Sequence, residues 1–289
     1  MRYRVRHTTA YRYEESVALS HNAARLVPRA DGRQRLFSSV TTITPRPAVV
    51  NRVNDYYGNV VETFAIEIAH ASLEVTTESD VEVLARPAFD ASLTPPWESL
   101  VAVDADLPFD VAEHRFESPL VPRTSSLRAL AEPHFPPGRP VLEGGLALCH
   151  AIFTTFAYDP DATTVSTQVL EVLERRRGVC QDFSQVMIGA LRSLGLPARY
   201  VSGYLETRPP PGTPRLVGAD ASHAWVQLYC GVELGFVDLD PTNDVVPGER
   251  HVTVAYGRDF SDVSPVKGLI LGGGKTTVDV AVDVEPLSA

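Results

Sequence analysis

Lysine is nearly absent from this chain of 289 residues, because only Lys267 and Lys275 among its 26 basic side chains are lysine. Cysteine is also scarce: three cysteines without a C-x-x-C pair do not form a disulfide framework and favour a reduced compartment. No apolar run approaches the roughly 20 residues of a membrane span, and the first residues contain no apolar stretch typical of a signal peptide. We therefore expect a cytoplasmic protein that does not insert into a membrane.

Positive charge is in deficit as well. The chain holds 36 acidic side chains against 26 basic ones, and its net charge of −10 argues against binding nucleic acid through phosphate contacts. The first 60 residues reverse the balance, with ten arginines against four acidic residues. Arginine in place of lysine is typical of a GC-rich genome and predicts no function by itself. With 44% hydrophobic and 21% charged residues, the composition is that of an ordinary globular protein.

The first 85 residues have the alternating, β-branched and aromatic pattern of strands. Such segments occupy residues 3–13, 40–44, 60–68 and 72–84. The sequence NDYYGN at residues 54–59 is a tight-turn signal and predicts a hairpin. Because no helical period appears here, we predict an all-β, sandwich-like N-terminal domain over residues 1–120.

Proline then becomes dense over residues 86–142, which forbids long regular elements and predicts an ordered linker with one short helix near residues 125–132. The second domain is predicted over residues 121–289. Its strongest helix begins at Cys180, keeps an apolar face as far as Leu194 and ends before Gly195. Three strands are expected after it, at residues 198–206, 223–230 and 233–238, with Gly231 as a hairpin turn, and residues 276–284 form a closing strand.

The position of Cys180 is the feature that points to chemistry. A thiol at a helix N-terminus experiences the positive end of the helix dipole and unpaired N–H groups, and both stabilise a thiolate. The same N–H groups can bind an oxyanion that forms on an attacked carbonyl. Gly178, two residues earlier, allows the backbone to approach closely.

A thiol nucleophile requires a base, and the base requires a group that orients it. His223 begins one predicted strand and Asp240 ends the next. If the two strands form a hairpin around Gly231, the start of one lies beside the end of the other, since His223 is eight positions before that glycine and Asp240 is nine after it. We therefore expect His223 and Asp240 to be neighbours at one edge.

Four sequence signals now occur in order: GVCQDF at 178–183, LPARYVSGY at 196–204, HAWV at 223–226 and DPTN at 240–243. Together they resemble the bacterial transglutaminase-like superfamily. The opening β region with its Tyr-Gly-Asn turn is similar to the β domain that precedes the core in one bacterial branch. The resemblance implies an α+β fold in which a papain-like transglutaminase core follows the β domain, with Cys180, His223 and Asp240 as a catalytic triad.

The resemblance also implies acyl transfer at the carboxamides of a peptide or protein substrate, through a thioester on Cys180. The backbone N–H of Cys180 is the expected oxyanion donor, and Tyr158 and Trp225 are weak candidates for a second donor or a substrate contact. No cofactor and no metal are expected, because histidines such as His150 and His251 have no partners at ligand spacing. The oligomeric state is undetermined.

Several alternatives stay open. Cys149 and Cys230 have the pattern of inert core thiols, as most buried cysteines do. Within the same fold, water could resolve the thioester, which would make the protein a cysteine peptidase or deamidase. A non-catalytic interaction scaffold is a third interpretation. The proline-rich loop at residues 208–214 could form a wall of the cleft or serve only as a spacer.

Overall fold

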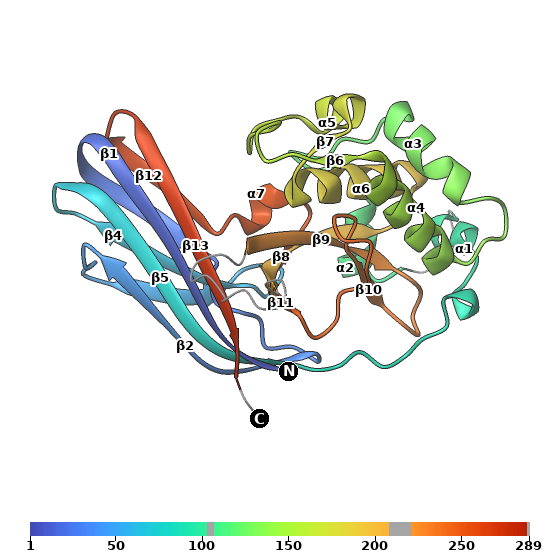
Figure 1. Ribbon diagram of the computed structural model, residues 1–289, viewed down its shortest axis with the longest axis horizontal. Helices are drawn as coiled ribbons and strands as arrows, with labels where there is room; N and C mark the ends of the chain where they lie inside the picture. Colours follow the sequence, from blue (N-terminus) through green and yellow to red (C-terminus); the bar gives the residue numbers. More distant parts are fainter. Residues whose placement is uncertain (103–106, 208–220, 288–289) are drawn as a thin grey trace, which may run out of the picture.

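The computed structural model describes residues 1–102, 107–207 and 221–287, and it contains a part built of strands and a part that mixes strands with helices (Figure 1). The strands are β1 (Arg2–Ala24), β2 (Gln34–Thr44), β3 (Val50–Asn54), β4 (Val60–Ile66), β5 (His70–Val83), β6 (Ala157–Tyr158), β7 (Arg177–Gly178), β8 (Ala198–Leu205), β9 (Ala221–Tyr229), β10 (Phe236–Leu239), β11 (His251–Gly257), β12 (Val266–Gly272) and β13 (Thr276–Pro286). The α-helices are α1 (Trp97–Val101), α2 (Phe109–Ala112), α3 (Ser125–Ala131), α4 (Val141–Thr155), α5 (Val169–Arg175), α6 (Cys180–Leu194) and α7 (Phe260–Val263), and the 3-10 helices are η1 (Ala91–Leu93), η2 (Glu113–Arg115) and η3 (Glu132–His134). The loop at residues 208–214 lies outside the described residues.

β1 is the strand around which the first sheet is built. Its first half pairs with β5 on one side and β13 on the other, whereas residues 20–24 pair with β4 and β12. The change of partners falls where the register with β5 shifts, between Arg12 and Val17. Both groups of strands contribute to one apolar cluster, which includes Val17, Ile43 and Phe64. This is the all-β, sandwich-like arrangement that the alternating sequence predicts.

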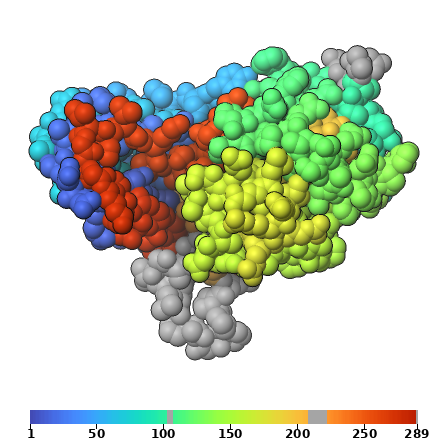
Figure 2. Space-filling view, turned by 90° about the horizontal axis from the view of Figure 1, so that it is seen from above, coloured from blue at the N-terminus to red at the C-terminus, as the bar shows by residue number. Residues whose placement is uncertain are grey.

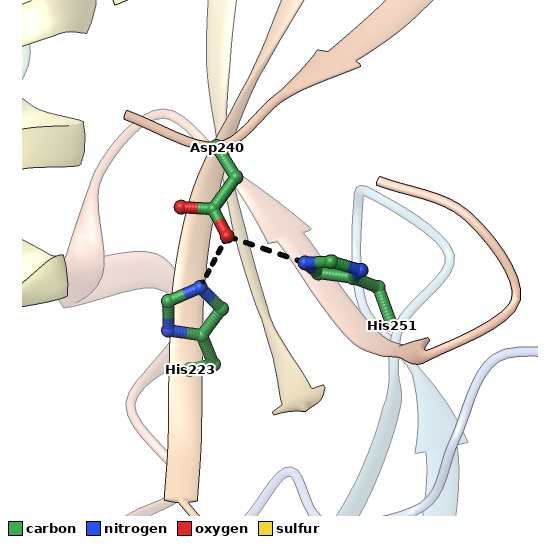
Figure 3. A group of neighbouring side chains, drawn as sticks. All are labelled: His223, Asp240 and His251. Atoms are coloured by element: carbon green, nitrogen blue, oxygen red, sulfur yellow. Dashed lines mark hydrogen bonds and ion pairs between the residues drawn. The ribbon is translucent and has the colours of Figure 1, made fainter. Parts of the chain in front are cut away.

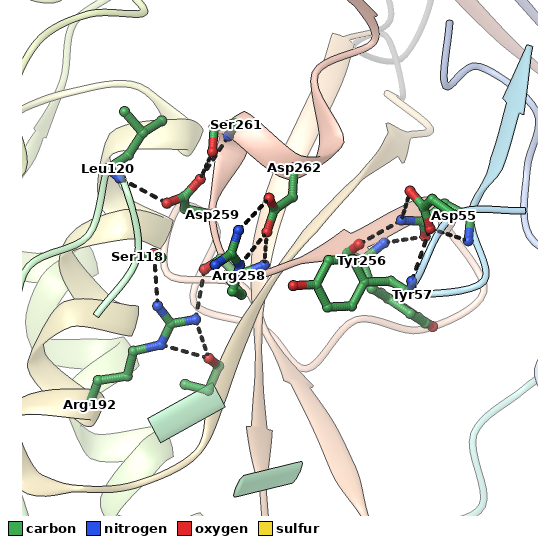
Figure 4. Close-up of polar contacts among 12 residues, drawn as sticks. Asp55, Tyr57, Ser118, Leu120, Arg192, Tyr256, Arg258, Asp259, Ser261 and Asp262 are labelled. Carbon is green, nitrogen blue, oxygen red and sulfur yellow. Dashed lines mark hydrogen bonds and ion pairs between the residues drawn. The ribbon is translucent and has the colours of Figure 1, made fainter. Parts of the chain in front are cut away.

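The predicted turn at residues 54–59 joins β3 to β4 as an antiparallel hairpin. Asp55 closes it, because its Oδ1 accepts the backbone N–H groups of Tyr57 and Asn59, and Gly58 has the positive φ of 74° that a side chain would disfavour. Asn59 is fully buried and exchanges two hydrogen bonds with the backbone of Tyr256 in β11, at 2.7 and 2.8 Å. The hairpin therefore also fastens the first sheet to the second part of the molecule (Figure 4).

The proline-rich segment contains only short helices, and the helix predicted near residues 125–132 is α3. Hydrogen bonds tie this segment to the second part of the molecule (Figure 4). The buried guanidinium of Arg192 donates to Ser118 Oγ, to the carbonyl of Ala198 and to the carbonyl of Arg258. Two residues along from Ser118, the N–H of Leu120 donates to the buried carboxylate of Asp259 at 2.8 Å. The domain boundary near residue 120 stays a prediction.

α6 packs against β8 and β9 of a four-stranded sheet with the order β10-β9-β8-β11 (Figure 1). The helices α3, α4 and α5 contact the other sides of α6. α6 ends where predicted, at Gly195, whose φ is 95°. β9 and β10 form the predicted hairpin, with Phe236 opposite Tyr229 and Leu239 opposite Val226. No helix in the described part of the chain is long and apolar enough to cross a membrane.

The predicted closing strand is present as β13, but its partner is β1. The last two strands, β12 and β13, therefore complete the first sheet, although they follow the second part in sequence. In Figure 2 they lie in red against the blue N-terminal strands at one end of the molecule. The first sheet therefore contains strands from both ends of the described chain.

Gly203 in β8 provides a test of how tightly the second sheet is packed. It lies opposite His223, and a Cβ at this position would overlap the carbonyl oxygen of Val252 and lie 2.5 Å from the Trp225 ring. Because a backbone oxygen and a buried indole cannot move aside easily, we expect Gly203→Ala to lower the free energy of unfolding by about 2–3 kcal/mol, measured by urea denaturation. The control is Gly248→Ala, where a Cβ meets nothing within 4 Å and the change should be within about 0.5 kcal/mol. Equal stability of the two variants would contradict the packing argument.

Candidate active site

Cys180 is the first residue of α6, and the turn before it is held in a defined shape. Asp182, in the first turn of the helix, accepts the N–H of Val179 at 2.9 Å and the hydroxyl of Thr163 at 2.6 Å. A Cβ on Gly178 would lie only 2.5 Å from the same carboxylate oxygen, so glycine is required there. Cys180 itself is half-buried. As the first residue of the helix, it has a backbone N–H with no partner within the helix.

The structure brings His223 and Asp240 together. His223 lies near the start of β9, and Asp240 directly follows the end of β10. The paired residues of this hairpin end at Leu239 and Val226, and just beyond them the Asp240 side chain reaches the ring of His223, with Oδ2 at 2.7 Å from Nε2. The contact expected from the spacing around Gly231 therefore exists.

Asp240 is completely buried and accepts hydrogen bonds from five donors, of which Figure 3 shows His223 and His251. Its Oδ1 accepts the backbone N–H groups of Thr242 and Asn243, at 2.9 and 3.3 Å. Its Oδ2 accepts from His223, from the Asn243 side chain at 2.7 Å and from His251 Nε2 at 3.2 Å. Burial disfavours the charge, but these hydrogen bonds prevail and hold the pKa of Asp240 well below its usual range. The carboxylate is therefore a permanent negative charge behind His223.

That negative charge determines the state of the imidazole. Burial alone would lower the pKa of His223, but the hydrogen bonds with Asp240 and with Cys180 raise it above its ordinary value. Because Nε2 faces Asp240, Nδ1 is the nitrogen left for Cys180. The ring can therefore carry a proton beside the sulfur at neutral pH.

The expectation that His251 has no partner at ligand spacing is wrong, because its Nε2 lies 3.2 Å from Asp240 Oδ2. His251 comes from β11, which pairs with β8 and not with β9, so no local spacing links it to Asp240. Its ring contacts Trp225 edge-on at a centroid distance of 5.3 Å. We infer that His251 positions Asp240, since it donates to the oxygen that His223 also uses.

The two weaker candidates occupy different environments. Tyr158 in β6 pairs with Gly178 and is 58% exposed; burial and the nearby Cys180 sulfur both raise its pKa. Trp225 is only 1% exposed, and its indole N–H donates to Asp238 at 2.9 Å. An oxyanion donor must be free to meet substrate, so Trp225 is not carried into the proposed mechanism, whereas Tyr158 stays a candidate.

The remaining sulfur and imidazole groups lie apart from this chemistry. Cys149 and Cys230 are buried, and burial raises the pKa of both thiols. His150 pairs with Asp244 at the surface.

Among the described residues, one group of side chains has the spacing of metal ligands, and it is His223, Asp240 and His251. The donor and acceptor atoms are 2.7 and 3.2 Å apart and directed at each other, as in hydrogen bonds. Each Nε2 that donates to the carboxylate carries a proton and has no lone pair for a metal. The arrangement is thus that of a hydrogen-bonded carboxylate, and the absence of a metal or cofactor stays a prediction.

Comparison with known families agrees with this geometry. Residues 3–82 match the bacterial transglutaminase-like N-terminal region, and residues 128–241 match the transglutaminase-like superfamily. The second match contains Cys180, His223 and Asp240. An uncharacterized protein of Mycobacterium tuberculosis is 42% identical over 99% of this chain and 93% of its own length, and one of Mycobacterium leprae is 36% identical over 99% of both. The chain belongs to the transglutaminase-like superfamily.

A solved structure has the same fold as this chain. A crystal structure from Cytophaga hutchinsonii, provisionally described as a cysteine protease, superposes with a TM-score of 0.80 at 18% identity and covers 100% of this chain and 91% of its own. A protein-glutamine gamma-glutamyltransferase of Pseudomonas aeruginosa is 33% identical over 109 residues, which are 35% of this chain and 16% of that protein. The papain-like transglutaminase core preceded by a β region is therefore confirmed as the fold.

The different environments of the three thiols predict selective alkylation. We expect iodoacetamide at near-neutral pH to label Cys180 about 100-fold faster than Cys149 or Cys230, because the latter two are buried with raised pKa values. Peptide mass spectrometry of timed samples measures the three rates. In urea the differences should disappear, which serves as the control, and equal rates in the folded protein would contradict the assignment.

Asp240 should control the pKa of His223. In Asp240→Asn the carboxylate charge is lost, so the pKa of His223 should fall, and the ring should lose its proton at a lower pH than in the wild type. The rate of any reaction that requires the imidazolium would then decline on the alkaline side at a correspondingly lower pH. An NMR titration of the histidine rings measures the shift, with Asp244→Asn as the control carboxylate that pairs with His150. An unchanged His223 pKa in Asp240→Asn would refute the role given to Asp240.

Proposed function

We propose that the protein is a thiol-dependent acyltransferase or hydrolase that acts on carboxamides of a peptide or protein. The observation that carries this proposal is the position of the His223 ring between the buried Asp240 carboxylate and Cys180 at the start of α6. This order of acid, imidazole and thiol is the one that activates a cysteine nucleophile. The superfamily match over residues 128–241 supports it.

In the first step, the Cys180 sulfur attacks the carbonyl carbon of the amide and forms a C–S bond. The carbonyl oxygen takes up the negative charge, and the N–H of Cys180 at the helix terminus is placed to stabilise it. The tetrahedral species then expels the amine or ammonia, which leaves with the proton from His223 Nδ1. Asp240 keeps its charge throughout and stabilises the imidazolium.

In the second step, an amine or a water molecule gives a proton to His223 and attacks the thioester carbon. The C–S bond breaks and Cys180 leaves as the thiolate, which restores the starting state. An amine acceptor gives transamidation, whereas water gives hydrolysis, and the same residues serve both. The glutamyltransferase relative from Pseudomonas aeruginosa favours a glutamine side chain as the donor amide. A cysteine peptidase or deamidase of the same fold is the second candidate.

The cofactor, the class of partner and the cellular location can be proposed as well. The chemistry needs no cofactor, and a net charge of −10 does not favour nucleic acid or an anionic membrane surface as a partner. We place the protein in the cytoplasm, which is supported by three free cysteines and no disulfide.

The test is to incubate the protein with a glutamine-containing peptide and a primary amine, and to follow the masses of the products. We expect either the amine adduct or the deamidated peptide, and Cys180→Ala should reduce the rate by about 10⁴-fold or more. Cys230→Ala, which changes a buried thiol outside the site, is the matched control and should keep its activity. If a broad panel of amides and peptides is not turned over and Cys180 is alkylated as slowly as the buried thiols, the non-catalytic scaffold is the better interpretation.

A further inference from the structure

A cavity of about 320 Å³ lies between the two parts of the molecule, behind the candidate active site. One wall comes from residues 29–34, which follow β1, and from Val83 and Arg86 at the end of β5. The other wall comes from β8, β9, β10 and β11, on the sheet face that carries Trp225 and Gln227. Cys180 is not part of the lining. His223 and Asp240 do not line it either, but His251, whose Nε2 donates to Asp240, does, so the cavity adjoins the candidate active site from behind.

Positive charge is concentrated in this cavity. Four arginines and two aspartates line it, which leaves a surplus of two positive charges; they are Arg29, Arg33, Arg86 and Arg199, with Asp31 and Asp238. In a protein with a net charge of −10, such a surplus of positive charge in one partly open cavity raises the electrostatic energy of the folded state locally. Burial lowers the pKa of both Arg86 and Arg199, which is the electrostatic sign of that higher energy.

The two aspartates pair with three of these arginines but do not balance their charge, and Asp31 Oδ2 lies 3.7 Å from Arg29 Nε. Asp238 Oδ2 lies 2.9 Å from Arg33 Nη1 and 3.6 Å from Arg86 Nη2, and its Oδ1 already accepts from Trp225 and Gln227. Three guanidinium N–H groups remain buried with no hydrogen-bond partner among the described residues: Nε of Arg29, Nε of Arg33 and Nη1 of Arg86. These three nitrogens have almost no surface open to solvent, so their unpaired N–H groups add to the cost of holding the arginines together.

The arginines are also held in fixed positions. The Arg199 guanidinium lies between the rings of Phe236 and Tyr256, at 4.1 and 4.2 Å, and its Nε donates to Gln227 at 2.7 Å. Arg29 belongs to the opposite wall of the cavity, and its guanidinium stacks on the Tyr256 ring, 4.3 Å from the ring centroid. Stacking of this kind orders long side chains before a ligand arrives and reduces the entropy that binding costs.

We propose that this cavity is a binding site for a small oxyanion. The ligand carries a carboxylate or phosphate group whose oxygens bind the guanidinium groups of Arg33 and Arg86, which line the cavity. Planar guanidinium groups match both kinds of oxyanion, and a volume near 320 Å³ suits a small metabolite but not a polymer. Trp225 lines the cavity, and its ring lies 6.0 Å from His223, so the ligand binds one side chain away from the active site.

Binding can be measured on the full chain with Trp97→Phe, which leaves Trp225 as the one tryptophan, through its fluorescence. Inorganic phosphate is one probe and succinate the other, at ionic strength kept constant with KCl. We expect a saturable change and a rise in Tm with at least one of the two probes. Saturation by phosphate alone identifies a phosphate ligand, and saturation by succinate alone identifies a carboxylate ligand. Cys180→Ala should bind as the wild type does, so the result does not depend on catalysis.

Arg86→Gln should weaken binding at least tenfold, while Asp238 keeps Arg33 as its partner. Arg25→Gln is the matched control, because Arg25 also pairs with one aspartate and is 17% exposed against 16% for Arg86, yet it does not line the cavity. If KCl alone produces the same fluorescence change, or if Arg86→Gln shows a change of the same size as the wild type, the cavity holds only water. If Arg86→Gln does not fold, titration calorimetry on the wild type decides. Binding of one anion per chain supports the site, whereas a heat of anion addition equal to the heat of KCl addition overturns it.

Discussion

The burial of one carboxylate constrains much of the second half of the chain. Asp240 has no contact with solvent, and a buried charge is stable only when donors surround it. Two of its five donors are backbone N–H groups of the turn that follows it, and three are side chains, from Asn243, His223 and His251. The two histidines come from strands that do not pair with each other, with β8 between them. Gly203 in β8 lies opposite His223, where a side chain would strike the Trp225 ring, so the small residue allows this packing.

The period of two along β9 and β10 places two carboxylate sites side by side. Asp238 and Asp240 are two residues apart, and His223, Trp225 and Gln227 follow the same alternation on β9. One carboxylate therefore receives an imidazole, while the other receives an indole and an amide N–H. In the proposed mechanism the first arrangement supplies a base for Cys180, whereas the second forms a wall of the arginine-lined cavity. A single sheet face thus connects the proposed chemistry with the proposed ligand site.

Local signals in the sequence were sufficient for the parts of the site that depend on neighbours along the chain. The helical period placed Cys180 at the start of α6, and the distance from Gly231 brought His223 to Asp240. Contacts across the sheet or between the two parts carry no such signal. His251 reaches Asp240 from β11, and Arg33 reaches Asp238 across 205 positions of sequence. Alternation likewise identified residues 276–284 as a strand but not its partner, because a half-buried strand has the same pattern in either sheet.

The pairing of β1 also has a consequence for the order in which the molecule can form during synthesis. One side of residues 3–13 finds its partner early, in β5, but the other side waits for β13, which is synthesised after the whole second part. Until then, β1 has an unpaired edge, and such edges bind other strands readily. The papain-like core lies between the two events in the chain and can fold while the edge is open. Completion of the first sheet therefore follows synthesis of the second part, and β12 and β13, which pair one after the other along β1, act as its closure.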